Sequence, residues 1–159
     1  MPGRGLMAAS IEIRLVAANE RAAWEPLWKG YLDFYKTTVP KEVYDTTWAR
    51  LQDSAEPMHL LGAYVDGRLL GIVHFLYHRS CWTIANYCYL QDLFVAEDAR
   101  KLGLGRALIE AVYRQAHNDG ASRVYWLTHE SNATARVLYD KLATWPGFIV
   151  YRHLFADRV

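Results

Sequence analysis

A glycine-bearing turn between an apolar strand and an amphipathic helix is the feature that most constrains this chain. Residues 95–105 are typical of a strand end, a tight turn with the sequence Arg-Lys-Leu-Gly-Leu-Gly at 100–105, and the start of a helix. A helix start carries unsatisfied N–H groups and a partial positive charge, so a turn that admits a phosphate to those donors forms an anion site. The pattern predicts that a phosphorylated cofactor binds here.

Three kinds of phosphate-binding loop compete for this turn. A P-loop requires Lys-Ser or Lys-Thr after its glycines, and neither follows here, which argues against nucleotide hydrolysis. A dinucleotide-binding turn requires a third glycine, but Leu108 occupies that position, and the preceding strand is not the first of the chain. The third pattern, R/Q-x-x-G-x-G/A of a pyrophosphate loop, is matched by Arg100, Gly103 and Gly105.

Composition argues against several other functions. The 18 basic and 17 acidic side chains leave a net charge of +1, so the molecule as a whole attracts no nucleic acid. No apolar run approaches the ~20 residues of a membrane span, and residues 1–9 lack the apolar region of a signal peptide, so a cytoplasmic protein without membrane contact is expected. Cys81 and Cys88 lack metal-ligand spacing and are interpreted as buried thiols, with no metal bound.

The order of predicted elements indicates an α/β fold with a mixed sheet. Hydrophobic periodicity predicts strands at 11–17, 59–65, 68–77, 87–95, 123–127 and 148–155, and helices at 19–35, 40–52, 104–118 and 133–142. Asn19 is expected to cap the first helix, and Asp66-Gly67 to form a two-residue hairpin turn with positive φ. We expect a single domain over residues 10–159, preceded by a flexible N-terminus at 1–9.

Three separate motifs, in this order along the chain, resemble the GNAT superfamily of acyl-CoA-dependent N-acetyltransferases. They are Tyr-Leu-Gln-Asp-Leu-Phe-Val at 89–95, the turn at 100–105, and Asn-Ala-Thr-Ala-Arg-Val-Leu-Tyr-Asp-Lys-Leu at 132–142, closed by Gly147-Phe148. The resemblance implies a GNAT-like fold with the order β-α-α-β-β-β-α-β-α-β and a splayed central sheet. The extra residues before Gly147 and the Trp- and Tyr-rich first helix are similar to the histone and polyamine acetyltransferase branch.

The resemblance also implies acetyl-CoA as co-substrate and assigns residues that bind it. In relatives the strand matching 87–95 splays from the strand matching 123–127, and the pantetheine arm fills the gap. Backbone groups of Phe94 and Val95 would bind the thioester arm, while turn amides hold the pyrophosphate, from Arg100, Lys101, Leu102, Gly103, Leu104, Gly105 and Arg106. Asn132 is implied to contact the pantetheine arm, although an Asn directly before a helix is equally typical of an N-cap.

Acetyl transfer to an alkylammonium requires a proton acceptor, because an amine with a pKa near ~10.4 is almost entirely protonated at pH 7. Several polyamine-type relatives carry a glutamate at the position of Gln91, and a glutamine takes no proton. Asp92, Glu130 and His129 remain as candidates, with Asp92 alternatively a structural partner at a β-bulge. Tyr139 matches a tyrosine that protonates the leaving thiolate in relatives, whereas the helix pattern alone would favour a core position.

The acceptor side is predicted from aromatic residues. Trp24, Trp28, Tyr31 and Tyr35 fall on one stripe of the first predicted helix, and such a stripe is usually packed core. In the resembling branch the first two helices cover the acceptor channel, where rings and carboxylates would suit a cationic amine. The substrate-binding candidates are Trp24, Trp28, Tyr31 and Glu130, with Trp82 and Tyr87 lining the same channel.

The resulting hypothesis is an enzyme that transfers an acetyl group directly from acetyl-CoA to a primary amine, without a metal. The acceptor is a polyamine, another small amine or a lysine side chain. The main alternative is a module that senses acyl-CoA without turnover, and the absence of a carboxylate at position 91 would be consistent with such a module. A dinucleotide oxidoreductase is the third hypothesis. A homodimer that pairs through residues 148–155 is expected from the relatives.

Overall fold

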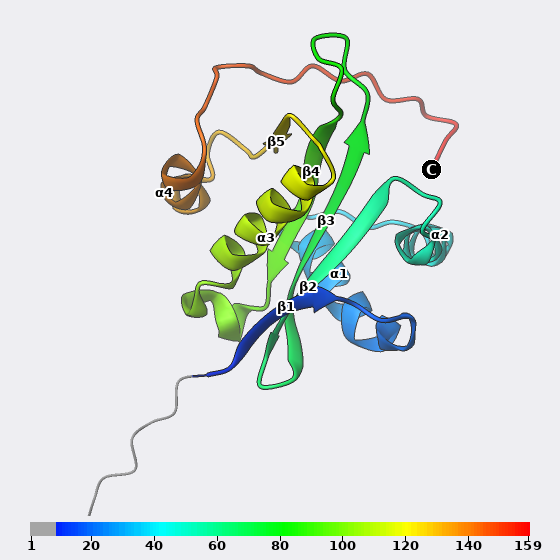
Figure 1. Ribbon diagram of the computed structural model, residues 1–159. Helices are drawn as coiled ribbons and strands as arrows, with labels where there is room; N and C mark the ends of the chain where they lie inside the picture. Colours follow the sequence, from blue (N-terminus) through cyan, green and yellow to red (C-terminus); the bar gives the residue numbers. More distant parts are fainter. Residues whose placement is uncertain (1–8) are drawn as a thin grey trace, which may run out of the picture. The chain divides into compact units, whose positions relative to one another are not determined.

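A mixed five-stranded sheet with the order β1-β2-β3-β4-β5 organises the first part of the chain (Figure 1). The computed structural model describes residues 9–159, so the prediction for the N-terminus at 1–9 lies outside the described residues apart from Ala9. The chain divides into one compact unit that ends at Trp126 and a second unit from Leu127 to Val159. The strands of the first unit are β1 (Ile11–Leu15), β2 (Met58–Val65), β3 (Arg68–His78), β4 (Tyr87–Val95) and β5 (Arg123–Tyr125).

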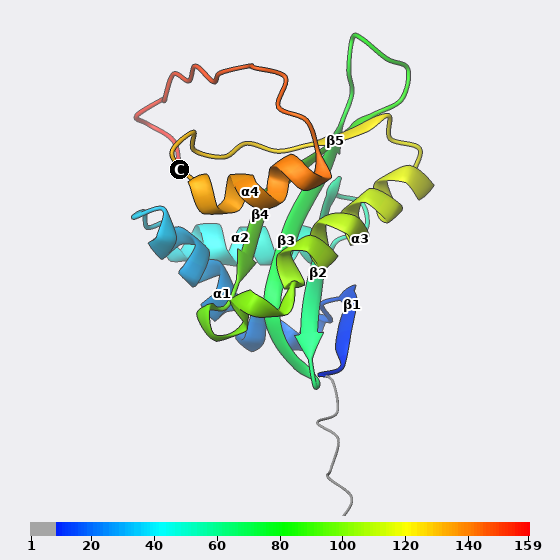
Figure 2. The same cartoon turned by 90° about the vertical axis from the view of Figure 1, so that its left-hand side faces the viewer.

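Helices cover both faces of this sheet. Helices α1 (Arg21–Phe34) and α2 (Lys41–Gln52) lie on one face, and α3 (Leu104–Asn118) lies on the other (Figure 2). The prediction that Asn19 caps the first helix is wrong, because a short 3-10 helix, η1 (Ala18–Glu20), precedes α1. There the carboxylate of Glu20 accepts a hydrogen bond from the backbone N–H of Ala17 instead.

The hairpin between β2 and β3 turns as predicted. Asp66 has φ 49° and Gly67 has φ 82°, the two positive values that a two-residue turn of this kind needs. β2 and β3 pair antiparallel from Val65 with Arg68 back to Met58 with Leu76. Local turn chemistry therefore sets the register of the pairs next to the turn, and a bulge between Ala63 and Tyr64 shifts it by one residue beyond them.

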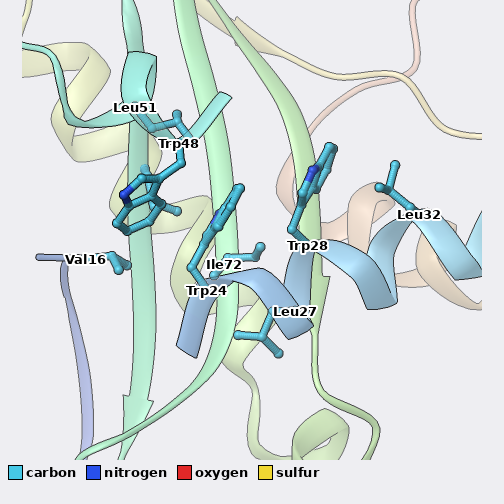
Figure 3. Packing of buried hydrophobic residues seen from close by; sticks show 9 residues of the cluster. Val16, Trp24, Leu27, Trp28, Leu32, Trp48, Leu51 and Ile72 are labelled. Atoms are coloured by element: carbon cyan, nitrogen blue, oxygen red, sulfur yellow. The ribbon is translucent and has the colours of Figure 1, made fainter. Parts of the chain in front are cut away.

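A cluster of large side chains packs between α1, α2 and the sheet. Figure 3 shows indole rings of α1 and α2 lying against aliphatic side chains of the strands and loops, with Val16, Trp24, Leu27, Trp28, Leu32, Trp48, Leu51 and Ile72 labelled. Trp24 is 0% exposed, and its ring centroid lies 5.0 Å from that of Trp48. Aromatic rings of this size bury large apolar areas, so this cluster anchors α1 to the sheet.

A β-bulge interrupts β4 at Gln91, as anticipated for the neighbourhood of Asp92. His74 pairs with Asp92, whereas the next residue of β3, Phe75, pairs with Leu90, which leaves Gln91 without a counterpart. Neighbours on a strand point to opposite faces, and paired residues share a face. The extra residue therefore places Leu90 on the face of Phe75 and turns Asp92 to the face of His74.

The sheet opens between β4 and β5. These strands pair in parallel at Tyr87 with Arg123, Cys88 with Val124, and Tyr89 with Tyr125. β5 then ends, while β4 continues to Val95. From Leu90 to Val95, β4 has a strand neighbour only on its β3 side within the described part of the chain, which is the opening that the GNAT resemblance implies.

The second unit contains one helix, α4 (Ala133–Leu142), with the bounds that the sequence predicts. The prediction of a strand at 148–155 is wrong, since the described residues 143–159 form neither a helix nor a strand. Apolar side chains of this segment are exposed, among them Phe148, Ile149, Val150, Leu154 and Phe155. A strand is held by hydrogen bonds to a neighbouring strand, and this segment is paired with none in the described structure.

Two further findings concern the cysteines and the question of a membrane-spanning helix. Cys88 is buried as predicted, but Cys81 is exposed, so its interpretation as a buried thiol is wrong. Cys81 lies in the loop between β3 and β4, outside either strand. Among the helices of the described region, none has the length and apolar character needed to cross a membrane.

Candidate active site

The predicted phosphate turn is a left-handed glycine at the start of a helix. After the 3-10 helix η2 (Glu97–Leu102), Gly103 has φ 76° and α3 begins at Leu104. The first hydrogen bond into the helix runs from the N–H of Ala107 to the carbonyl of Gly103 at 3.1 Å. The N–H groups of Leu104, Gly105 and Arg106 precede that bond and have no acceptor within the helix.

Open space adjoins this helix start. A Cβ placed on Gly103 would meet no heavy atom within 4 Å. A helix N-terminus of this kind attracts negative charge, and its backbone donors reach a phosphate without help from side chains. The turn therefore fits the diphosphate of a coenzyme.

The side chains of the turn contribute less to this site than its backbone does. Leu104 is fully buried, and Arg106 donates to Glu110 one helical turn further along, at 2.9 Å. Arg100 donates to the carbonyl of Val95 at 3.4 Å, and its guanidinium lies 5.9 Å from the centroid of the Phe94 ring. Lys101 and Leu102 are exposed. Three of the predicted cofactor residues in this turn carry a positive charge. Arg106 is paired with Glu110, whereas Arg100 and Lys101 have no acidic partner in the described contacts and could face a phosphate.

Phe94 and Val95 lie on the unpaired stretch of β4, directly before this turn. Their β3 side is occupied, because Phe94 pairs with Ile72 and Val95 with Gly71. The Phe94 ring points toward α1, where a Cβ on Gly30 would approach its Cζ atom to 2.7 Å. Backbone groups on the free side of β4 fit an extended pantetheine arm, while the Phe94 side chain serves packing.

A buried polar network lies beside the bulge. The indole Nε1 of Trp24 donates to Nε2 of His74 at 3.0 Å, and Nδ1 of His74 lies 3.0 Å from Oδ2 of Asp92. The Tyr31 ring of α1 lies near the same carboxylate, whose charge contributes to the pKa of its hydroxyl. His74 and Asp92 are 5% and 8% exposed, so three elements, α1, β3 and β4, converge on one nearly buried carboxylate.

Tyrosine rings surround this carboxylate. Burial raises the pKa of Tyr31 well above its ordinary value, and the charge of Asp92 and the hydrogen bond to it add to the effect. Burial followed by the charge of Asp92 also raises the pKa values of Tyr35 and Tyr89. All three phenols therefore stay protonated at neutral pH. Trp28 stacks on Tyr31 with 5.0 Å between centroids, and its buried Nε1 has no hydrogen-bond partner in the described structure.

The predicted site residues of the first unit differ in how deeply they are buried. Gln91 is exposed at the bulge, and Asp92 is buried beneath it. Trp24 and Trp28 belong to the packed core, while Tyr31 is half-buried. Trp82 is exposed in the loop before β4, and Tyr87 packs under the guanidinium of Arg123, 4.0 Å from its ring centroid.

Sequence reasoning missed His74, which lies between apolar residues of β3. A histidine inside the run Leu-Leu-Gly-Ile-Val-His-Phe-Leu-Tyr is an unusual residue for a buried strand and was the available signal. Its partners, however, lie 50 and 18 residues away along the chain, so no local spacing connects them.

Glu130, Asn132 and Tyr139 lie in the second unit. Asn132 holds the N-cap position of α4, but its side chain makes no capping bond and instead donates to Oγ1 of Thr128 at 3.3 Å. Glu130 is exposed, and its carbonyl accepts a hydrogen bond from Arg136. Tyr139 is half-buried on α4, and His129 lies in the preceding turn.

Comparison with known proteins identifies relatives over most of the chain. The sequence model of the family described as "Acetyltransferase (GNAT) family" matches residues 24–143. The D-amino-acid N-acetyltransferase HPA3 of Saccharomyces cerevisiae is 38% identical over 146 residues, which cover 89% of each chain. The thialysine N-epsilon-acetyltransferase of Caenorhabditis elegans is 29% identical over 83 residues, covering 52% of this chain and 51% of the relative.

The fold is also that of solved acetyltransferases. A structure of AAC(6')-Iy in complex with a bisubstrate analogue of CoA has a TM-score of 0.79 and 17% identity, covering 92% of this chain and 99% of that one. The similarity to a D-amino-acid N-acetyltransferase leaves the histone and polyamine branch unconfirmed. Family match, sequence identity and fold agree on the wider assignment. The chain belongs to the GNAT family of acetyltransferases and is an N-acetyltransferase.

Proposed function

We propose that this enzyme transfers the acetyl group of acetyl-CoA directly to the primary amine of a small molecule, in a ternary complex without a covalent enzyme intermediate. The observation that carries the proposal is the adjacency of three features in one unit. The unpaired stretch of β4 runs into the Gly103 turn, and the Asp92 carboxylate lies beside the bulge of the same strand. An extended acyl carrier and a cationic acceptor thus have neighbouring binding positions.

Acetyl-CoA is held mainly by backbone groups in this proposal. The N–H groups at the start of α3 bind its diphosphate, with Arg100 and Lys101 adding charge, and the free edge of β4 at Phe94 and Val95 binds the pantetheine arm. A backbone N–H near Phe94 would stabilise negative charge on the thioester oxygen as the amine attacks. Asn132 remains a proposed contact to the same arm.

The acceptor enters as an ammonium ion and must lose a proton before its nitrogen attacks the carbonyl carbon. Gln91 accepts no proton, so Asp92 is the proposed group that binds the ammonium and takes its proton, directly or through a water, and Tyr31 supplies an aromatic wall. The relatives' names point to amines carried by free amino acids. We therefore propose amino-acid and polyamine amines as the acceptors to test first, with lysine peptides included, and keep Glu130 as a candidate second contact to the acceptor.

Tyr139 is proposed to protonate the sulfur that leaves when the carbon–sulfur bond breaks. Tyr139→Phe should lower kcat without changing the affinity for acetyl-CoA, because it removes the phenolic proton and keeps the ring. Isothermal calorimetry and steady-state kinetics measure the two effects separately. A Phe variant as fast as the wild type would remove Tyr139 from the mechanism.

One experiment separates transfer from mere acyl-CoA binding. The protein is incubated with acetyl-CoA and panels of D- and L-amino acids, polyamines, lysine peptides and aminoglycosides, and free CoA is quantified by chromatography, since the exposed Cys81 would react with a thiol reagent. Amine-dependent CoA release supports the proposal. Acetyl-CoA binding in calorimetry, with no release for any amine, would favour a sensor instead.

We also propose a homodimer formed through residues 148–155. Their exposed apolar side chains, and a backbone that belongs to no helix or strand of the described structure, suit pairing with the same segment of a second copy. Sedimentation equilibrium of the wild type and of a chain truncated after Trp145 tests this. A wild type that is monomeric at millimolar concentration would refute it.

A further inference from the structure

The network beside the bulge contains two residues that no part of the proposed mechanism uses. Building on the proposed function, we infer that the indole of Trp24 locks His74 as the neutral tautomer protonated at Nδ1, and that this imidazole positions Asp92 to receive the acceptor's ammonium group. Trp24 and His74 are then positioning residues for the amine side of the reaction.

The direction of each hydrogen bond follows from the chemistry of the indole. A tryptophan Nε1–H is a donor only. At 3.0 Å from Nε1 of Trp24, Nε2 of His74 must be the acceptor, so it carries no proton. The ring proton of a neutral imidazole then resides on Nδ1, which donates to Oδ2 of Asp92 at 3.0 Å. Trp24 therefore determines the tautomer that Asp92 meets.

Groups from three elements surround Asp92. His74 donates to it from β3, and the pKa values of Tyr31 and Tyr35 on α1 and of Tyr89 on β4 are all raised in part by its charge. The hydrogen bond from His74 fixes the orientation of the carboxylate. A nearly buried carboxylate without a Lys or Arg partner in the described contacts is also a site that a substrate cation would complete.

The bulge explains why this arrangement serves the acceptor and not only the core. If β4 continued from the Leu90–Phe75 pair without a bulge, Gln91 would lie opposite His74, and Asp92 would lie opposite Val73 on the face of Phe75. The bulge places the carboxylate on the α1 face at the point where β4 has lost β5 as a neighbour. A purely structural network would not require this position at the opening of the sheet.

The tautomer is tested first in the wild-type protein, with no ligand present. Long-range proton–nitrogen NMR correlations distinguish a protonated ring nitrogen from a bare one, and His74→Asn identifies the His74 signals by their loss. We expect a neutral ring with the proton on Nδ1 at pH 7. A ring protonated on Nε2, or on both nitrogens, would overturn the inference.

Two amide variants then separate the two ends of the imidazole. The amide nitrogen of Asn occupies the place of Nδ1, so His74→Asn keeps a donor for Asp92, whereas His74→Gln reaches only toward Trp24. We expect His74→Gln to raise the KM for the amine about tenfold or more, since a lost hydrogen bond to a charged group is worth that much, and His74→Asn to stay within a few fold. The KM for acetyl-CoA should change in neither.

The outcomes distinguish this inference from the proposed function. Equal amine KM values for His74→Gln and wild type, in an enzyme that turns over, would refute the positioning role and leave the function intact. Absence of turnover with every amine would refute the proposed function, while the NMR experiment would still decide the tautomer. Trp24→Phe removes the donor to Nε2, and its His74 ring should no longer show a single tautomer; an unchanged spectrum would contradict the role of Trp24.

Discussion

Gly30 brings α1 close to β4, and replacing it with alanine tests how tightly the site is packed. An ideal Cβ on Gly30 would lie 2.7 Å from Cζ and 2.8 Å from Cε1 of Phe94. Carbon atoms pack best at about 3.5–4.0 Å, so the ring must shift by roughly 1 Å. Helix propensity alone favours alanine over glycine by about 1 kcal/mol, whereas overpacking of this kind costs about 1–3 kcal/mol.

The second effect is the larger, so Gly30→Ala should lower the free energy of unfolding by about 1 kcal/mol. For a chain of this size that corresponds to a fall in Tm of about 2–4 °C. Urea denaturation followed by circular dichroism measures the change directly. Since Phe94 belongs to the proposed cofactor edge of β4, the variant should also bind acetyl-CoA more weakly.

Phe94→Leu provides the matched control. A leucine side chain ends before the Cζ position, so adding Gly30→Ala to Phe94→Leu should cost nothing or restore the gain expected from helix propensity. The double-mutant cycle isolates this one contact. If Gly30→Ala alone stabilises the protein by about 1 kcal/mol, the close approach of α1 and β4 described above is wrong.

Three further predictions concern other parts of the molecule. Hydrogen bonds from Arg14, Ala17 and Tyr64 lower the pKa of Glu20 to about 2, so the stability that Glu20 contributes is complete above the ordinary pKa of a glutamate and is lost as the pH falls toward 2. Glu20→Gln should therefore have a lower Tm than wild type at pH 6, and the difference in Tm should shrink as thermal melts are run at more acidic pH. A difference that is the same at every pH would contradict this. Burial raises the pKa of Cys88 to about 12, so a thiol reagent should modify the exposed Cys81 alone in the native protein, and Cys81→Ser should abolish the fast phase that Cys88→Ala retains. Gly103→Val should weaken acetyl-CoA binding in calorimetry far more than Gly103→Asn, because φ 76° suits asparagine better than a β-branched residue, and equal affinities would mean that the turn does not bind the diphosphate.

Local features of the sequence were sufficient to predict much of the fold. β4 and α4 have the predicted bounds, and the Asp66-Gly67 turn has the predicted backbone angles, because periodicity and glycine conformation act within a few residues. The same holds for the Gly103 turn before α3. Its proposed role as an anion site depends on N–H groups that every helix start exposes, and the glycine pattern was enough to predict where the helix starts.

Other features depend on residues far apart in the chain. The segment 148–155 is rich in β-branched and aromatic residues, as strands are, but its hydrogen-bond partner would have to come from elsewhere, and the described structure pairs it with no strand. Asn19 looks like a helix cap, yet the contacts of Glu20 with Arg14 and Tyr64 favour a 3-10 turn at that point. For residues 148–155 the strand partner is missing, and at Asn19 the contacts of Glu20 are present. In both cases interactions outside the local sequence pattern decided the local structure.

The primary structure was enough to predict the family, the elements up to α4 in their order, and the glycine turn before α3, because motifs and periodicity operate over short stretches of chain. The environment of Asp92 depended on folding. One extra residue in β4 reverses the face of that carboxylate, and indole, imidazole and phenol groups from two other elements then converge on it. His74 is hydrogen-bonded to Trp24 and Asp92, which lie 50 and 18 positions away, so no local sequence pattern connects these residues. The role of a histidine within an apolar strand could therefore be inferred only from the tertiary structure.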